Sequence, residues 1–217
     1  MTKIKGVIFD MDGLLIDSEP LWRKAICSIY NDLGYSMTEQ MAASTMGMRS
    51  DEVAKYWLSY FDDTKNSYKD VELNTLSLVQ ELIEKEGVMM PYVQETLDFF
   101  KHEQIPIAIA SSSPLGIIQS VVDKLGIERY FKVMCSAEYE EYGKPHPAVF
   151  ISTANYLRVA PTDCLVFEDS ISGVIAAKAA KMQCIAVPSQ QDYDNPKFAL
   201  ADLKIRSLKE FLEKEKK

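Results

Sequence analysis

The sequence has no apolar run that approaches the length of about 20 residues that a membrane-spanning helix needs. Its opening stretch, MTKIKGVIFD, reaches an acid after a short apolar segment, and no small-residue cleavage site follows, so we expect no signal peptide. The cysteines are few and too widely spaced for a disulfide framework or a zinc site: Cys27, Cys135, Cys164 and Cys184. We therefore expect reduced thiols and a cytoplasmic protein.

Positive charge is also in short supply, with 24 Lys and Arg residues against 32 Asp and Glu residues and a formal net charge of −8. A nucleic-acid binder or a protein of anionic membrane surfaces needs a basic face, so we expect neither partner. A small anionic substrate is compatible with this charge, because local donors and a bound metal outweigh the overall field at short range. With no long exposed apolar stretch in sight, we expect a monomer.

A chain of 217 residues is long enough to bury a sizeable core. Short runs rich in Val, Ile and Ala alternate with helical patterns, which predicts a parallel sheet covered by helices on both faces. The predicted strands are Ile4–Asp10, Ile105–Ser111, Lys132–Ser136, Cys164–Glu168 and Cys184–Val187. The predicted helices between them are Pro91–His102, Pro114–Leu125, Pro147–Leu157 and Ile171–Met182.

The segment from about Ser18 to Gly87 breaks this alternation, because it shows no strand signal and several helical patterns in a row. Apolar residues recur there at helical spacing: Leu21, Ala25, Ile29 and Leu33, then Val71, Leu76, Val79 and Ile83. We therefore predict an α/β fold in which residues 1–17 and 88–217 form the parallel-sheet core and residues 18–87 form an inserted all-helical domain. The Lys-rich end, EKEKK, is interpreted as a solvated helix terminus.

Polar residues follow several predicted strands at the point where each strand ends. In open parallel sheets ligands bind beyond the carboxyl ends of the strands, so we expect these residues to meet at one edge. They are Asp10 and Asp12 after the first strand, Ser111–Ser113 after the second, Lys144 in the loop GKPHP, and Glu168 and Asp169 after a later strand. Taken singly, each has an ordinary explanation as a turn, a helix cap or a surface charge. Their joint occurrence predicts metal-assisted phosphoryl transfer.

Each group has a chemical reason to be there. A phosphate ester repels an attacking carboxylate, so Asp10 needs a divalent cation, and Asp10 and Asp169 offer the hard oxygen ligands that Mg²⁺ prefers. Ser111 and the following amides can donate to phosphate oxygens, and Lys144 offers a point charge. Asp12 is two residues beyond Asp10 and is predicted to protonate the leaving oxygen and then to activate water.

These motifs closely resemble those of the haloacid dehalogenase superfamily over nearly the whole chain. FDMDGLLIDSE matches its first motif, IAIASSS its second, the lysine of GKPHP its third and VFEDSISG its fourth. The helical insert resembles the small helical cap over a Rossmann-like core in the beta-phosphoglucomutase-like branch. DMDGLLIDSEPLW together with MGMRSDEV looks most like the hexose- and hexitol-phosphate phosphatases of that branch, including 2-deoxyglucose-6-phosphatase.

The resemblance implies a role for each acid. Asp10 is implied as the nucleophile and Asp12 as the acid and base. The implied Mg²⁺ site consists of Asp10, the backbone carbonyl of Asp12 and Asp169, with Glu168 close by.

The resemblance also implies that Ser111, with Ser112 beside it, and Lys144 bind the phosphate of a small phosphorylated substrate. In such proteins the peptide bond into Pro145 is expected to be cis, which is a way to aim the lysine inward.

Residues of the insert are expected to select the substrate, because a cap closes over the leaving group and excludes water. The candidates are Glu19, Trp22, Met46, Met48 and Arg49. Arg49 is suited to pair with an anion and Trp22 to pack on a sugar ring. Core packing is the competing interpretation for Trp22 and the methionines. Segments near residues 14–18 and 87–91 are predicted to act as hinges.

Departures from the family pattern separate its subclasses. The presence of Asp12 argues against a dehalogenase, because the dehalogenases of the superfamily lack this aspartate and work without metal. The mutases carry a cap histidine near the place where this chain has Trp22. The phosphonate-cleaving relatives carry a Schiff-base lysine near the place where this chain has Arg49, so both subclasses fit the sequence less well. We therefore predict a Mg²⁺-dependent sugar phosphatase. A beta-phosphoglucomutase-type phosphotransferase, a pyrophosphatase, a phosphoglycolate phosphatase and a non-catalytic phosphometabolite sensor remain as alternatives.

Overall fold

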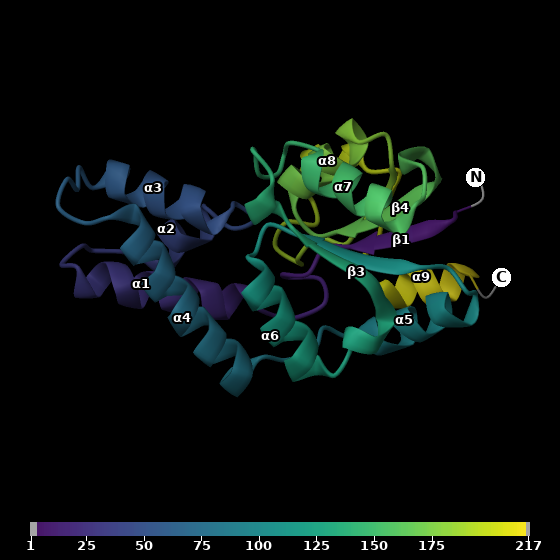
Figure 1. The fold of residues 1–217 in the computed structure, drawn as a ribbon, viewed down its shortest axis with the longest axis horizontal. Helices are drawn as coiled ribbons and strands as arrows, with labels where there is room; N and C mark the ends of the chain where they lie inside the picture. Colours follow the sequence, from purple (N-terminus) through teal and green to yellow (C-terminus); the bar gives the residue numbers. More distant parts are fainter. Residues whose placement is uncertain (1–3, 216–217) are drawn as a thin grey trace.

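The computed structural model describes residues 4–215 and contains a six-stranded parallel sheet with the strand order β3-β2-β1-β4-β5-β6 (Figure 1). The strands are β1 (Gly6–Phe9), β2 (Ile107–Ser111), β3 (Phe131–Ser136), β4 (Cys164–Glu168), β5 (Gln183–Ala186) and β6 (Leu203–Lys204). Each parallel connection runs through helical segments, as such a sheet requires. The predicted α/β class is confirmed.

Helices cover both faces of the sheet, as the almost continuously apolar strands predict. α5 (Val93–His102), α6 (Leu115–Leu125) and α9 (Leu208–Glu215) lie on one face, and α7 (Ala148–Leu157) and α8 (Ile171–Ala179) lie on the other (Figure 1). Within β1, Val7 and Phe9 join the core of the first face, and Ile8 joins that of the second. All three side chains are fully buried.

The five predicted strands are confirmed, β4 with the predicted bounds and the others with ends that differ by at most two residues, whereas β6 was missed. β6 has two residues and pairs only with β5 at the edge of the sheet, so its sequence carries no detectable alternation. The Lys-rich end begins within α9, which ends at Glu215 and buries Leu208 and Phe211. Its last two residues lie outside the described part of the chain.

Four phenylalanines pack beneath the edge of the sheet that carries the acids. Phe9 and Phe167 lie on neighbouring strands and stack with ring centroids 4.9 Å apart. Phe100 of α5 contacts both rings edge-on, and Phe211 of α9 packs against Phe100 and Phe167. This cluster fixes the ends of β1 and β4 and therefore the residues that follow them.

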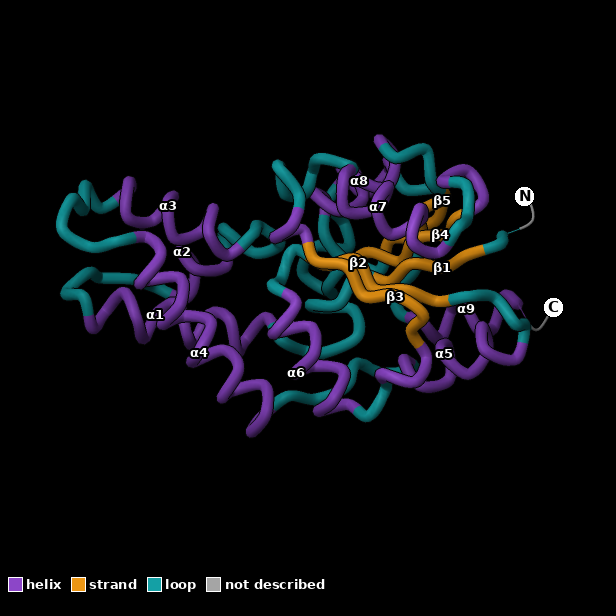
Figure 2. The backbone as a smooth tube through the Cα atoms, in the orientation of Figure 1, coloured by secondary structure: helices purple, strands orange, loops and turns teal. Residues whose placement is uncertain are grey.

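The segment between β1 and α5 is all helical, as predicted, and is formed by α1 (Glu19–Asp32), α2 (Glu39–Ala43), α3 (Ser50–Tyr60) and α4 (Tyr68–Glu86). Figure 2 shows these helices grouped beyond one end of the sheet. Their far ends share an apolar core of their own: Ile26, Tyr30, Met37, Ala42, Trp57, Leu58 and Val71. Among the described residues, none of the helices has the length and apolarity to cross a bilayer. The limits of the insert at residues 18 and 87 stay a prediction.

The insert is attached to the sheet domain through two connections that pair with each other. The amide of Asp17 donates to the carbonyl of Val88 at 2.9 Å, and the amide of Met90 donates to that of Leu15 at 3.0 Å. At the near end of the insert, α4 also reaches α6, where the Lys124 ammonium donates to the carbonyl of Glu84 at 2.6 Å.

Replacing Phe167 by alanine is expected to lower the free energy of unfolding by about 3–5 kcal/mol, because the change leaves a cavity between three other phenylalanines. Urea denaturation followed by circular dichroism measures the change. Tyr156→Ala is the matched control, since this aromatic side chain is exposed, and its effect should stay within about 0.5 kcal/mol. Equal losses in the two variants would contradict this account of the core.

Candidate active site

The parallel register of β1 and β4 places two acids side by side. Phe9 is opposite Phe167 in the ladder, so Asp10 and Glu168 follow at the same edge. The amide of Asp10 donates to the carbonyl of Phe167 at 2.9 Å and carries the pairing one residue further. Ser111 ends β2 on the other side of β1. The predicted convergence at the carboxyl ends of the strands is therefore what the structure shows.

Lys144 lies between the two acids and is almost completely buried. Its ammonium donates to Oδ1 of Asp10 at 2.6 Å, to Oε1 of Glu168 at 2.7 Å and to the carbonyl of Ala110 at 3.1 Å, which uses all three of its hydrogens. Burial lowers the pKa of Lys144, but the two carboxylates outweigh it and raise the pKa above the ordinary value. The lysine is held as a cation. Its peptide bond to Pro145 is cis, as predicted.

Asp10, Glu168 and Asp169 form a compact carboxylate cluster, in which one oxygen of each residue lies within 4.8 Å of the other two. Burial raises the pKa of Asp10 to about 8 against the opposing effect of Lys144, and burial together with Glu168 raises the pKa of Asp169 well above its usual range. A single lysine does not neutralise three carboxylates, so the cluster favours binding of a cation. Hard oxygen ligands in this arrangement fit Mg²⁺.

Two glycines make room for these carboxylates. A Cβ atom on Gly13 would lie 2.2 Å from Oδ2 of Asp169, and the backbone of Gly13 has a φ of +73°, which disfavours other residues. A Cβ atom on Gly173 would lie 1.6 Å from Oε1 of Glu168. A side chain at either position would displace an acid of the cluster.

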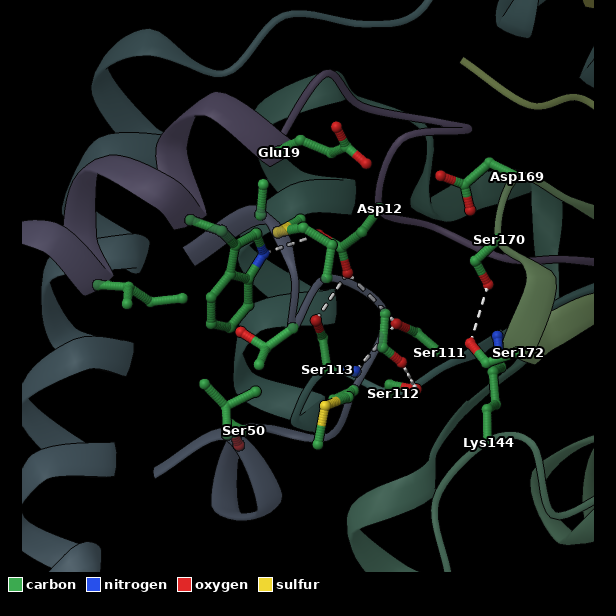
Figure 3. Close-up of a pocket in the computed structure, with 18 of the residues that line it drawn as sticks. Asp12, Glu19, Ser50, Ser111, Ser112, Ser113, Lys144, Asp169, Ser170 and Ser172 are labelled. Carbon is green, nitrogen blue, oxygen red and sulfur yellow. Dashed lines mark hydrogen bonds between the residues drawn. The ribbon is translucent and has the colours of Figure 1, made fainter. Parts of the chain in front are cut away.

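The carboxylate of Asp12 lies apart from this cluster and accepts four hydrogen bonds. Figure 3 shows those from Ser111 and Ser113. Its Oδ1 accepts from Ser18 Oγ at 2.6 Å and from Trp22 Nε1 at 3.0 Å. Its Oδ2 accepts from Ser113 Oγ at 2.7 Å and from Ser111 Oγ at 3.4 Å. Two donors come from the segment that leads into and begins the insert, and two come from the end of β2 and the loop that follows it.

Ser18 was not predicted as a site residue, and Ser113 was predicted only as one of the polar residues at the strand ends. Trp22 was expected to pack on a sugar and not to donate a hydrogen bond to Asp12. Ser18 reads as a helix cap, and Ser113 reads as one of three loop serines. No local pattern shows that side chains from three segments converge on one carboxylate.

A cavity of about 370 Å³ lies between the strand ends and the helical insert, within the size range of small-molecule sites. The sheet domain contributes Asp10, Asp12, Ser111, Ser112, Lys144 and Asp169 to its lining, and the insert contributes Glu19, Trp22, Met46 and Met48. Figure 3 shows Asp169 and Lys144 on one side and Ser50 of the insert on the other. Glu168 is fully buried behind Lys144. Most of the predicted site residues therefore surround one cavity.

Arg49, like Glu168, does not line the cavity, and the predicted contact of Arg49 with the substrate is not what the structure shows. Its guanidinium forms an ion pair with Asp51, with Nε 2.6 Å from Oδ1. The same group donates to the carbonyls of Ala137 at 3.2 Å and Glu140 at 2.8 Å in the loop after β3. Asp51, two residues further along, therefore holds the guanidinium together with these two carbonyls.

Ser112 also makes a contact that the sequence did not indicate. Its hydroxyl donates to the carbonyl of Gly47 in the insert at 3.1 Å. Gly47 has a φ of +80°, and a Cβ atom there would lie 3.3 Å from Ser172 Oγ of the sheet domain. Together with Arg49, this loop holds the insert over the cavity.

Saturating Mg²⁺ is expected to raise the Tm by about 5 °C or more, because a ligand that binds only the folded state stabilises it. The gain should be larger at pH 9 than at pH 6, since protons on Asp10 and Asp169 compete with the metal. Differential scanning fluorimetry measures both effects.

Asp169→Asn should remove the gain from Mg²⁺ and raise the Tm of the metal-free protein. A carboxyl whose pKa is raised by folding disfavours the folded state at neutral pH, because the unfolded chain ionises it more easily. The exposed Asp194→Asn is the matched control and should behave as the unmodified protein. An undiminished Mg²⁺ gain in Asp169→Asn would contradict this assignment.

Comparison with known proteins agrees with the chemistry of the cavity. Over 214 residues the chain is 36% identical to hexitol phosphatase B of Escherichia coli (strain K12), covering 98% of this chain and 96% of the relative. It is 34% identical over 185 residues to a phosphorylated carbohydrates phosphatase of Thermotoga maritima, with 84% of each chain covered. The crystal structure of beta-phosphoglucomutase from Clostridium difficile superposes with a TM-score of 0.85 at 22% identity, over 98% of this chain and 96% of that one, and shows the shared fold.

The model of the haloacid dehalogenase-like hydrolase family matches residues 7–187. This range includes all four motifs on which the resemblance was based, and the resemblance is confirmed. The chain belongs to the haloacid dehalogenase-like hydrolase family.

Proposed function

We propose that the protein is a Mg²⁺-dependent phosphatase that hydrolyses small phosphorylated sugars of the hexose- or hexitol-phosphate class through an aspartyl-phosphate on Asp10. The observation that carries this proposal is the buried pairing of Asp10 with Lys144 beneath a cavity that also exposes Asp12. Relatives that are named as phosphatases of hexitol phosphates and of phosphorylated carbohydrates support the substrate class.

Asp10 and Asp169 would hold the metal, with Glu168 close by and the backbone carbonyl of Asp12 as a further oxygen ligand. The bound metal supplies the positive charge that lets a carboxylate approach an anionic phosphate. Lys144 adds a fixed charge beside the nucleophile. It bonds one oxygen of Asp10 and leaves Oδ2 without a hydrogen bond from the described residues.

In the first step an oxygen of Asp10 forms a bond to phosphorus as the bond from phosphorus to the sugar oxygen breaks. Asp12 gives a proton to the leaving oxygen, so the sugar departs as a neutral alcohol. In the second step Asp12 takes a proton from water, which attacks the phosphorus and releases phosphate and free Asp10. Ser111 and the amides that follow it bind the phosphate oxygens throughout.

The residues around Asp12 link this chemistry to the insert. Ser18 and Trp22 hold one oxygen of Asp12, and both belong to the segment where the insert begins. We propose that residues 18–87 act as a cap that moves about the paired connections and excludes water from the cavity when it closes. Glu19, Met46 and Met48 would then face the sugar.

The protein is further proposed to be a cytoplasmic monomer without nucleic-acid or membrane partners. The net charge of −8 supports the absence of nucleic-acid and anionic-membrane partners, and the four free cysteines support a reducing compartment.

The test of the function is phosphate release with Mg²⁺ from a panel of hexose phosphates, hexitol phosphates, pyrophosphate and phosphoglycolate. We expect release from the sugar phosphates, and Asp10→Asn should lower kcat by about 1,000-fold or more. Isomerised hexose phosphate without free phosphate would instead support a mutase, and no reaction with any ester would support a sensor.

Trp22→Phe is expected to lower kcat by about 10-fold, because Asp12 loses one of the donors that orient it. Steady-state kinetics on the best sugar phosphate measures the change. Tyr56→Phe, on the exposed surface of the insert, is the control and should leave kcat unchanged. An unchanged kcat in Trp22→Phe would show that this hydrogen bond has no part in turnover.

A further inference from the structure

The two ends of the cavity differ in charge. At the end formed by the sheet domain Lys144 faces the cavity, and it is the only lysine or arginine among the described residues that line it. The remaining charged residues of the lining are acids, and those outside the carboxylate cluster and Asp12 are Glu19, Glu72 and Asp192. Glu19 and Glu72 belong to the insert, whereas Asp192 follows β5 in the sheet domain. The described residues of the insert therefore contribute carboxylates to the lining and no lysine or arginine, and only Glu19 has a partner outside the lining, Arg23 at 3.3 Å.

Glu72 is held in one orientation by a single strong contact. Oε1 of Glu72 on α4 accepts from Ser50 Oγ at the start of α3 at 2.6 Å. No other described residue donates to this half-buried carboxylate. A carboxylate has about four acceptor sites, so Glu72 keeps most of its capacity for hydroxyl groups of a ligand.

The wall around Glu72 is largely apolar. Besides Glu72, the insert contributes Ile26, Val53 and Ala54 to the lining of the cavity. The hydroxyl of Thr75, one turn along the same helix as Glu72, already donates to the carbonyl of Val71 at 2.8 Å. An apolar wall with one oriented acceptor matches a carbon chain that carries hydroxyl groups, because C–H faces pack on the wall and O–H groups donate to the carboxylate.

The cation that is adjacent to Ser50 in sequence already has partners. Arg49 is adjacent to Ser50 in sequence, but its guanidinium is bound by Asp51 and by the carbonyls of Ala137 and Glu140. A second phosphate at this end would meet Glu72 without a compensating charge, in a site where water screens poorly.

Resting on the proposed function, we propose that Glu72, oriented by Ser50, determines the specificity of the site. It accepts hydrogen bonds from the hydroxyl groups of an uncharged polyol or sugar leaving group and excludes substrates that carry a second phosphate.

The experiment compares kcat/KM for sorbitol 6-phosphate and fructose 1,6-bisphosphate in the unmodified protein, Glu72→Gln, Glu72→Lys and the control Glu81→Gln. Glu81 lies on the exposed face of the same helix. The unmodified protein should favour the monophosphate by about 100-fold or more. Glu72→Gln should lower kcat/KM for the monophosphate by about 10- to 100-fold, which is the range expected for the loss of a hydrogen bond to a charged group.

Glu72→Lys should raise kcat/KM for the bisphosphate by about 10-fold or more. A misfolded protein would not show this gain. Glu81→Gln should match the unmodified protein on both substrates. Equal use of the two substrates by the unmodified protein, or an unaffected monophosphate reaction in Glu72→Gln, would overturn the role of Glu72.

Hydrolysis of p-nitrophenyl phosphate with Mg²⁺ separates this failure from failure of the proposed function. If that ester is hydrolysed while the selectivity is absent, only the role of Glu72 falls. If neither it nor a sugar phosphate releases phosphate, the proposed function falls and the role of Glu72 falls with it.

Discussion

The rest of the site depends on the ion pairs that the ammonium of Lys144 forms with Asp10 and Glu168. It lies between Asp10 and Glu168 in a nearly water-free position, so each charge is stabilised only because the others are present. Removing one member would leave a buried charge without a partner. The lysine also sets the geometry, since its three hydrogen bonds connect the ends of β1, β2 and β4. The three carboxylates still outnumber the lysine, so the cluster carries a negative charge that favours a cation at the place where a phosphate would bind.

The meeting of the motif residues at one edge was predictable because each of them follows a strand of the sheet. A short apolar run is a local signal, and parallel strands end at one edge, so the positions of Asp10, Ser111 and Asp169 follow from the sequence once the strands are recognised. β6 escaped prediction because a two-residue edge strand is fixed by its neighbour and not by its own pattern. The role of Gly13 was also hidden, since nothing near it in the sequence shows that Asp169 needs the space.

The insert was predicted less well for a different reason. Its helices are visible as a 3.6-residue period, but the partners of its polar side chains are distant in the chain. Arg49 was expected to meet the substrate and instead binds Asp51 and carbonyls 88 and 91 residues away. Trp22 was expected to pack on a ligand, but its indole N–H donates a hydrogen bond to the carboxylate of Asp12. A charged residue in a loop has several partners within reach, and only the folded structure selects among them.

The paired connections of the insert have a consequence for how such a protein can change. Asp17 and Val88 are joined by a backbone hydrogen bond, so the chain leaves the sheet domain and returns to it at the same place. A short turn would close the gap if everything between were removed. The helical segment is therefore modular: an exchange for another segment could alter which molecules are admitted while leaving Lys144 and its two carboxylates in place. Recognition can therefore diverge on this architecture while the charges at the strand ends stay the same, provided that the exchanged segment keeps donors for Asp12.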